Sequence, residues 1–336
     1  MTTETEIRDL QGVFQRLKKT IGTVIVGHEE VVEATLICLL CGGNLLLEGV
    51  PGLGKTLLVR TLACALGLKF ARIQFTPDLM PADIIGTNII SENSGQRRFS
   101  FSPGPVFANV LLADEINRAT PKTQSALLEA MEECTVTVGN TTHQLEEPFI
   151  VLATQNPIEM EGTYPLPEAQ LDRFFLKAIA RYPTLDQLTE ITQRNTEANG
   201  RQSSLPFSRN LPAQVINAEE ILRARQVISE YPLADPLRNY VSRLVLATHP
   251  TSANAPQQVR EYVEYGASPR AALSLIMGAK AHAFLSGKFN VRITDLEAVF
   301  FPAMIHRIIL NFKGEAEGIQ VEEVLTAVQS ATAKIL

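Results

Sequence analysis

Residues 49–56 read Gly-Val-Pro-Gly-Leu-Gly-Lys-Thr, and they follow an apolar run at residues 44–48 that reads Asn-Leu-Leu-Leu-Glu. The octapeptide matches the P-loop pattern G-x-x-x-x-G-K-[ST], in which a strand turns sharply into a helix. The turn exposes backbone N–H groups at a helix N-terminus, where the helix dipole also favours an anion. Lys55 is expected to reach the β- and γ-phosphates of a nucleotide, and the Thr56 hydroxyl to ligate Mg²⁺. A glycine-rich turn that merely precedes a lysine is disfavoured by the strand before it and the helix after it.

The length and composition of the chain indicate a globular protein with two domains. It has 336 residues, of which 45% are apolar and 20% charged, and this length exceeds one ordinary core. The net charge of −6 and the lack of a lysine- or arginine-rich block disfavour nucleic acid as the main substrate. The N-terminus has no signal-peptide pattern and no apolar run is long enough to cross a bilayer, so we expect a cytoplasmic protein with no membrane span.

The cysteines and histidines do not predict a metal site. Cys38 and Cys41 have C-x-x-C spacing, but they lie in an apolar helical stretch with no second ligand pair at zinc spacing downstream. We interpret them as small buried hydrophobic residues. The five histidines are scattered along the chain, so the only metal expected is Mg²⁺ bound with a nucleotide.

Strand and helix patterns alternate through the first half of the chain. Strands are expected near residues 44–48, 70–75, 110–113 and 149–153, helices near 7–21, 29–40, 55–66 and 121–132, and a hairpin at 135–145. This alternation predicts an α/β fold with a parallel sheet covered by helices on both faces. Residues 86–107 are polar and glycine-containing, and we expect an insertion there.

The character of the sequence changes after residue 183. From residue 186 onward the pattern is helical almost throughout, with polar breaks at 199–210 and 250–258. We therefore expect an α/β nucleotide-binding domain over residues 1–183, followed by a smaller all-α domain over residues 184–336.

The second buried strand ends in two carboxylates, Asp114 and Glu115. Hydrolysis of a phosphoanhydride requires a held metal ion and an activated water. We expect Asp114 to hold Mg²⁺ and Glu115 to polarise the attacking water. A solvated acidic turn is the alternative, and the apolar strand before the pair, about sixty residues after the P-loop lysine, disfavours it.

Three further polar residues are candidates for the same site. Asn156 follows the third strand, at the edge where strand ends converge, and could orient the water or contact the γ-phosphate. Arg173 and Arg270 lie far from the P-loop in sequence, so a role requires folding back or contact with a neighbouring subunit. As surface arginines they would have no role, and the sequence alone leaves both interpretations open.

Together these motifs resemble the MoxR branch of the AAA+ ATPases. The resemblance rests on residues 49–56 and on four further stretches. These are 72–81 (Arg-Ile-Gln-Phe-Thr-Pro-Asp-Leu-Met-Pro), 111–119 (Leu-Leu-Ala-Asp-Glu-Ile-Asn-Arg-Ala), 153–157 (Ala-Thr-Gln-Asn-Pro) and 166–174 (Leu-Pro-Glu-Ala-Gln-Leu-Asp-Arg-Phe). It spans about residues 24–270 and implies a P-loop AAA+ sheet sandwiched by helices and followed by an α-helical lid domain.

The resemblance assigns roles to individual residues. Residues 49–56 would be Walker A, Asp114 and Glu115 Walker B, Asn156 sensor 1 and Arg270 sensor 2. Arg173 would be the arginine finger that acts on the adjacent subunit's nucleotide, with Arg118 as the alternative. The residues expected to contact ATP are Val26, Gly27, Gly49, Pro51, Gly52, Leu53, Gly54, Lys55, Thr56 and Leu57. Residues 86–107 would form the helix-2 insert, and 135–145 the pre-sensor-1 hairpin.

The resemblance also implies a function and partners. Similar proteins are chaperone-like ATPases that remodel or mature partner proteins, commonly ones with a von Willebrand A domain, which this chain lacks and a separate protein would supply. A homo-oligomeric ring is expected, a hexamer when nucleotide is bound. The alternatives are a nucleic-acid-stimulated motor, a magnesium-chelatase-like motor subunit, and a nucleotide-gated scaffold with slow hydrolysis. For the first of these, the contact would be Arg97, Arg98, Phe99 and Phe101.

Overall fold

Two compact units make up the chain in the computed structural model, which describes residues 3–50, 52–93, 96–156, 162–196 and 211–333. The sheet unit contains Gly12–Leu166 and Ala178–Leu222, and the helical unit contains Met1–Gln11, Pro167–Lys177 and Arg223–Leu336. The chain therefore leaves the sheet unit at residue 167 and re-enters it at residue 178, so no single cut separates the two units. The polar break expected at residues 199–210 lies outside the described residues.

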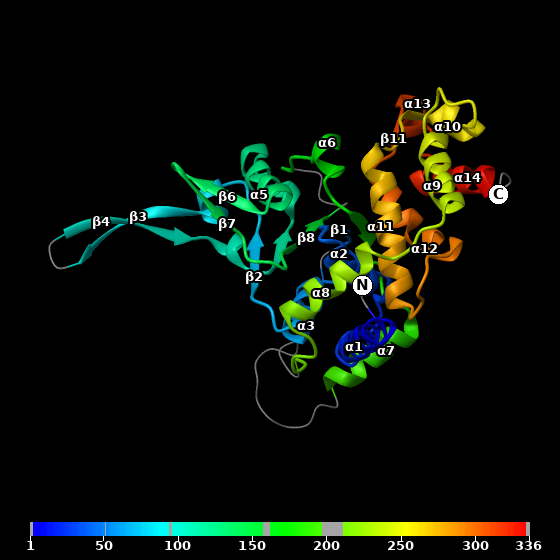
Figure 1. The fold of residues 1–336 in the computed structure, drawn as a ribbon. Coiled ribbons are helices and arrows are strands. Elements are labelled where there is room, and N and C mark those ends of the chain that lie inside the picture. Colours follow the sequence, from blue (N-terminus) through cyan, green and yellow to red (C-terminus); the bar gives the residue numbers. More distant parts are fainter. Residues whose placement is uncertain (1–2, 51, 94–95, 157–161, 197–210, 334–336) are drawn as a thin grey trace. The chain divides into compact units, whose positions relative to one another are not determined.

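A five-stranded sheet organises the sheet unit (Figure 1). Its strands are β1 (Leu45–Glu48), β2 (Phe70–Gln74), β5 (Val110–Asp114), β8 (Ile150–Gln155) and β9 (Leu176–Ile179), in the order β2-β5-β8-β1-β9. The pairs β1–β8, β5–β8 and β2–β5 are parallel. Residues 45–47, 110–113 and 150–153 are at most 1% exposed, as expected for a parallel sheet covered on both faces.

Four helices associated with this sheet begin and end close to the predicted positions: α1 (Glu4–Gly22), α2 (Glu29–Cys41), α3 (Lys55–Leu66) and α5 (Pro121–Glu133). The helices α4 (Pro81–Ile85) and α7 (Leu185–Thr196) and the 3₁₀ turns η1 (Pro105–Phe107) and η2 (Ile116–Arg118) had no predicted bounds. α2 is buried along most of its length because its apolar residues surround the helix instead of forming one stripe. The expected α/β class is thus confirmed.

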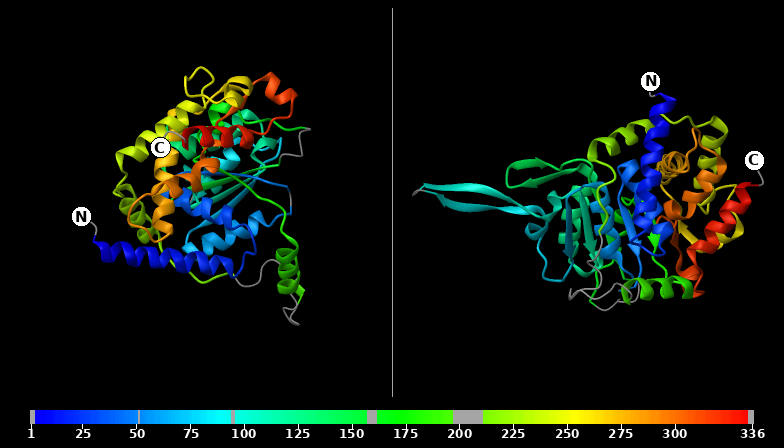
Figure 2. Two further views of the ribbon diagram at one scale, coloured as in Figure 1. Left: turned by 90° about the vertical axis from the view of Figure 1, so that its right-hand side faces the viewer. Right: turned by 90° about the horizontal axis from the view of Figure 1, so that it is seen from below.

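Two hairpins extend the sheet unit. β3 (Gly86–Asn93) pairs with β4 (Gln96–Pro103), and β6 (Thr135–Val138) pairs with β7 (Thr141–Gln144), both antiparallel. The β3–β4 hairpin extends away from the rest of the sheet unit, as Figure 1 and the right-hand view of Figure 2 show. The two hairpins contact each other through the stacked rings of Phe101 and His143, whose centroids are 4.0 Å apart. These hairpins occupy the positions predicted for the two insertions.

The helical unit is built almost entirely from helices. They are α6 (Glu168–Leu171), α8 (Ala218–Ser229), α9 (Asp235–Ala247), α10 (Gln257–Tyr262), α11 (Pro269–Leu285), α12 (Ile293–Met304), α13 (Phe312–Ala316) and α14 (Val321–Ala333), with a small β10 (Val263–Tyr265) and β11 (Ile309–Leu310) pair. α11 packs against α9 and α12, and the side chains of Leu275, Phe284 and Phe300 between them are at most 1% exposed. Within the described residues, no helix combines the length and apolarity needed to cross a bilayer.

Candidate functional site

The phosphate loop connects β1 to α3. Gly52 and Gly54 have φ of 86° and 74°, in the left-handed region that other residues rarely adopt. A Cβ added at either glycine would meet no atom within 4 Å, so the loop requires glycine for its backbone conformation. A Cβ at Gly49 would instead lie 2.8 Å from the Ala180 Cβ, so this position requires glycine for close packing. Pro51 lies outside the described residues.

Lys55 begins α3 and reaches back over the loop. Its Nζ donates to the Gly49 carbonyl at 2.7 Å. Burial lowers the pKa of this lysine, while the carboxylates of Asp114 and Glu115 act in the opposite direction. The lysine therefore lies within electrostatic range of both acidic residues. Thr56 and Leu57 follow it in the first helical turn and are half-buried.

The parallel register brings the ends of three strands to one edge of the sheet. Glu48 pairs with Gln155, and Ala113 pairs with Ala153. Gly49, Asp114 and Asn156 come at or directly after these ends, so the structure brings together the three motifs that sequence reasoning selected. Asn156 is 5% exposed, and burial of its amide is consistent with a positioned polar group.

A threonine that sequence reasoning did not select joins the two acidic residues. The Thr154 hydroxyl donates to Asp114 Oδ1 at 2.6 Å, and Thr154 Oγ1 accepts the Glu115 backbone N–H at 2.9 Å. Thr154 is fully buried on β8, the strand beside β5. Its only signal in the sequence was its position two residues before Asn156.

The Glu115 carboxylate accepts two hydrogen bonds from side chains. Gln74 Nε2 donates to Glu115 Oε2 at 2.9 Å, and Arg118 Nη1 donates to the same oxygen at 3.0 Å. Arg72 Nη2 donates to Gln74 Oε1 at 2.6 Å and to Asp114 Oδ2 at 2.7 Å. Because Arg72 occupies the amide oxygen of Gln74, the amide nitrogen faces Glu115. Sequence reasoning missed the roles of Arg72 and Gln74, which alternate with buried residues on β2.

The backbone at Glu115 is in an uncommon conformation. Its φ is 57°, which costs a residue with a side chain about 1 kcal/mol or more. The Thr154 hydroxyl holds this conformation through the Glu115 N–H. Arg72 and Gln74 on β2 link the carboxylates of Asp114 and Glu115 through a chain of hydrogen bonds.

A pocket of about 280 Å³ lies at the start of α2. Its lining includes Val26, Gly27, His28, Tyr182, Pro183 and Gln187. The ring nitrogen Nε2 of His28 is 3.1 Å from the Leu53 carbonyl, so this histidine connects the pocket to the phosphate loop. Val26 and Gly27, predicted to flank the adenine base, thus line a cavity next to the loop. His28 was not predicted.

Arg173 and Arg270 belong to the helical unit. Both are exposed: Arg173 lies two residues after the end of α6, and Arg270 lies in the first turn of α11. Arg118, the alternative arginine finger, lies on η2 in the sheet unit with 43% of its side chain exposed. The structure places Arg118 beside Glu115 of the same chain.

The donor set at the sheet edge fits Mg²⁺. The Thr56 hydroxyl and the Asp114 carboxylate are hard oxygen ligands of the kind that Mg²⁺ prefers, and this ion usually takes few protein ligands and keeps nucleotide oxygens and waters. The described residues contain no group of three or more His, Cys, Asp or Glu side chains that could hold a metal ion.

Comparison with known proteins identifies the family. Residues 44–176 match the ATPase family associated with various cellular activities (AAA), and residues 256–328 match the AAA lid domain. Chaperone MoxR1 of Mycobacterium tuberculosis is 40% identical over 98% of this chain and 83% of its own length, and Protein MoxR of Paracoccus denitrificans is 30% identical over 92% of each chain. A crystal structure of a protein from Cytophaga hutchinsonii is similar with a TM-score of 0.88 and 39% identity, covering 98% of this chain and 96% of that one. The chain therefore belongs to the MoxR family of AAA+ ATPases.

Proposed function

We propose that this protein hydrolyses ATP with Mg²⁺ and uses the reaction to remodel partner proteins. The observation that carries the proposal is the convergence of the phosphate loop, Asp114 and Asn156 at one edge of the parallel sheet, with Lys55 reaching back over that loop. A phosphate group above the loop would meet backbone N–H groups, the α3 dipole and the Lys55 ammonium. The adenine base would enter the pocket lined by Val26 and Gly27.

Thr56 and Asp114 would hold Mg²⁺, which when bound neutralises charge on the phosphate oxygens. Thr154 and Arg72 orient the Asp114 carboxylate, one through each oxygen. Both side-chain hydrogen bonds to Glu115 end on Oε2, and we assign Oε1 to accept the proton of the attacking water. Asn156 would orient that water.

The arginines connect hydrolysis to assembly in this proposal. Arg173 acts on the nucleotide of a neighbouring subunit and Arg270 on the nucleotide of its own. The hydrogen bond from Arg118 to Glu115 of the same chain supports Arg173 as the residue that acts between subunits. Such an arginine requires a head-to-tail interface, which closes into a ring, and we propose a hexamer in the nucleotide-bound state.

The partners in this proposal are proteins, including separately encoded proteins with a von Willebrand A domain. The relative from M. tuberculosis carries the name chaperone. The β3–β4 hairpin, which projects from the sheet unit (Figure 2) and exposes Ile89 and Ile90 at 47% and 61%, is the element we assign to contact with a protein client.

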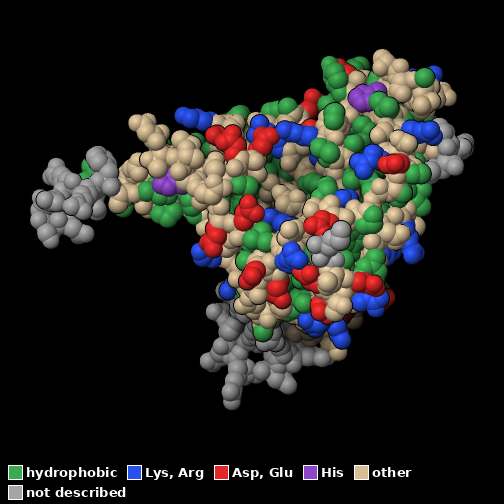
Figure 3. Space-filling view, viewed as in Figure 1, with side chains coloured by type: hydrophobic (Ala, Val, Ile, Leu, Met, Phe, Trp, Pro, Cys, Tyr) green, Lys and Arg blue, Asp and Glu red, His purple; other side chains and the backbone are tan. Residues whose placement is uncertain are grey.

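A nucleic-acid motor is less well supported. Acidic and basic side chains are interspersed on the face drawn in Figure 3, whereas a phosphate backbone requires a block of positive charge. Phe101, a candidate for base stacking, stacks instead on His143. The side chains of Arg97, Arg98 and Phe99 lie outside the described residues.

The test is Glu115→Gln in the purified protein. We expect kcat for ATP to fall about 100-fold or more, because general-base catalysis contributes at least this factor, while nucleotide affinity stays within about threefold. A pull-down with this variant in ATP should retain the protein client that the wild-type protein releases. Unchanged turnover would show that Glu115 is not the base.

A further inference from the structure

Arg307 binds the segment that carries Arg173. The Arg307 side chain is 2% exposed, and its Nε donates to Asp172 Oδ1 at 2.7 Å. Its other N–H groups donate to the carbonyl oxygens of Asp172, Phe174, Phe175 and Ala303 and to the hydroxyl of Ser274. A guanidinium is always charged and has five donors in a fixed fork. The positive charge of the buried Arg307 is therefore paired with the Asp172 carboxylate, and its N–H groups donate mainly to oxygens of residues 172–175.

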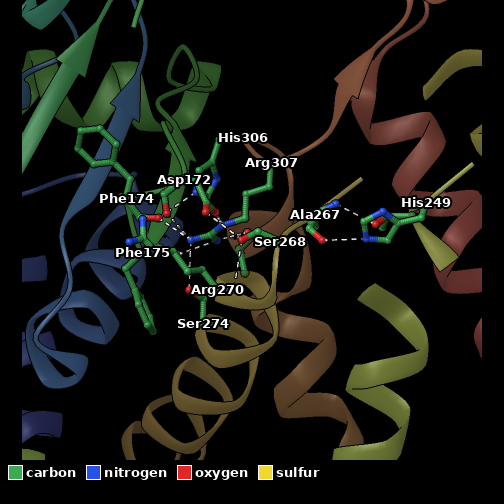
Figure 4. A network of polar contacts seen from close by, with 12 residues as sticks. Asp172, Phe174, Phe175, His249, Ala267, Ser268, Arg270, Ser274, His306 and Arg307 are labelled. Carbon is green, nitrogen blue, oxygen red and sulfur yellow. Dashed lines mark hydrogen bonds and ion pairs between the residues drawn. The ribbon is translucent and has the colours of Figure 1, made fainter. Parts of the chain in front are cut away.

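The other oxygen of Asp172 binds the beginning of α11 (Figure 4). The Ser268 hydroxyl donates to Asp172 Oδ2 at 2.9 Å and accepts the backbone N–H of Arg270 at 3.1 Å. Ser268 is the N-cap of α11, and its side chain uses both its donor and an acceptor position. Asp172 therefore precedes Arg173 in the chain and is linked to the backbone N–H of Arg270 by two hydrogen bonds that share the Ser268 hydroxyl.

The residue on the other side of Arg173 is also fixed. The Phe174 side chain is fully buried, and its carbonyl accepts from Arg307 Nη2 at 2.8 Å and from His306 Nε2 at 3.0 Å. Burial, with the neighbouring Arg307 cation, holds the pKa of His306 well below 6.5, so its ring is neutral at pH 7 and Nε2 carries the proton. The backbone of Arg173 is held on both sides while its side chain is exposed.

We propose that Arg307, Asp172 and Ser268 form a clamp that sets the position of Arg173 relative to Arg270, so that the two arginines move as one body. The inference rests on the proposed roles of these arginines in ATP hydrolysis. Since Arg270 acts on the nucleotide of its own subunit and Arg173 on that of the next, the clamp couples consecutive sites of a ring. Its members position the arginines and do not contact nucleotide.

The first variant is Asp172→Asn, which keeps the shape of the side chain and removes its charge. Its matched control is Asp295→Asn, because Asp295 is a fully buried carboxylate of the same unit, paired with Lys288 and His282, and has no contact with the clamp among the described residues. We expect both variants to lower the unfolding temperature. Only Asp172→Asn should lower kcat, by about tenfold, with KM for ATP within about twofold.

A double-mutant cycle tests whether Asp172→Asn lowers kcat through Arg173. In an Arg173→Ala background, Asp172→Asn should cause no further loss of kcat, because residues that act as a unit are not additive. Independent losses that multiply would overturn the clamp, as would an equal loss of kcat in Asp295→Asn. If Arg173→Ala lowers kcat and Asp172→Asn does not, only the clamp is refuted. If Arg173→Ala leaves kcat unchanged, the proposed role of Arg173 fails and the clamp with it.

A milder pair of variants covers the case in which Asp172→Asn does not fold. Ser268→Ala removes one hydrogen bond of the clamp and the cap of α11, and Asn311→Ala removes the comparable cap of α13. We expect kcat to fall about threefold in Ser268→Ala only. Equal kcat in the two variants would refute the coupling through Ser268.

Discussion

The phosphate site of the sheet unit and the clamp of the helical unit are built in opposite ways. In the sheet unit, Asp114 ends β5, Asn156 follows β8, and Lys55 begins α3 after the loop that follows β1. Neighbouring parallel strands bring these strand ends to one edge. In the helical unit, Asp172, Ser268 and Arg307 come from separate segments and meet in a network around a buried cation. Chemistry therefore depends on short contiguous motifs, whereas the placement of the arginines depends on contacts between distant residues.

Loss of the loop lysine should have the largest effect. Lys55→Ala should lower turnover on the order of 1,000-fold, because removing one preorganised charged donor from a reacting group costs up to this factor, and it should leave thermal unfolding nearly unchanged. A steady-state ATPase assay and a thermal melt measure the two effects. Lys69→Ala is the control, since Lys69 is 69% exposed in a surface ion pair. A large drop in stability of Lys55→Ala would contradict the view that this site is separable from the fold.

The variant Thr154→Val tests whether a residue outside the sequence motifs contributes to kcat and to stability as the motif residues do. The change leaves Asp114 Oδ1 and the Glu115 N–H without their partner, so we expect a loss of about 2 kcal/mol in the free energy of unfolding and about tenfold in kcat.

Thr61→Val is the control for that variant. Thr61 is also fully buried, and its Oγ1 has no hydrogen-bond partner among the described residues. Replacing this hydroxyl by a methyl group should be neutral or slightly stabilising. Equal losses in the two variants would show that burial alone, and not the link between the two carboxylates, decides the outcome.

The helical unit should lose stability in acid through His306. The pKa of His306 in the folded state lies well below 6.5, its ordinary value. At pH values between the folded-state pKa and 6.5, the unfolded state binds more protons than the folded state. The free energy of unfolding therefore falls as the pH falls through this range. The slope is at most about 1.4 kcal/mol per pH unit. His306→Asn retains a donor for the Phe174 carbonyl and removes the titration. Denaturant melts from pH 7.5 to 5.5 should show a shallower decline in this variant, and identical slopes would contradict the assignment.

The smallest expected effects are on the free energy of unfolding, from alanine substitutions at two glycines, one in each unit. Gly278 lies inside α11, and an added Cβ would lie 3.5 Å from Val299, an ordinary contact. Gly278→Ala should therefore stabilise by about 0.5–1 kcal/mol. Gly54→Ala should destabilise by about 1 kcal/mol and weaken nucleotide binding, because Gly54 has a φ of 74°. Chemical denaturation measures both, and a destabilised Gly278→Ala would indicate that α11 and α12 cannot accept the extra methyl group.

The elements that sequence patterns predicted best are those with strong local signals. α3 was predicted at residues 55–66 and is observed there, because glycines bound it on both sides. β8 runs to Gln155, beyond the apolar run that predicted it, since pairing with β1 continues past the last apolar residue. The β10–β11 pair was not predicted: its strands have three and two residues, too short for a periodic pattern.

The same distinction holds for the candidate site. Residues 49–56, Asp114, Glu115 and Asn156 could be chosen from the sequence because each carries its own pattern. His28, Arg72, Gln74 and Thr154 could not, because each acts through a neighbour from another strand or loop. A hydrogen bond between residues 25 or more apart in the chain leaves no periodic trace in the sequence.

By itself, the sequence determined the family, the parallel α/β core and the residues that can cradle a phosphate, because strand burial, glycine turns and strand-end carboxylates are local consequences of backbone geometry. Only the tertiary structure decided which oxygen of Asp114 binds which partner, how Glu115 is held, and that Asp172 links Arg173 to the beginning of α11. The physical reason is that a side chain's partners depend on which segments the packed core brings within about 3 Å, and that distance is set by the whole fold.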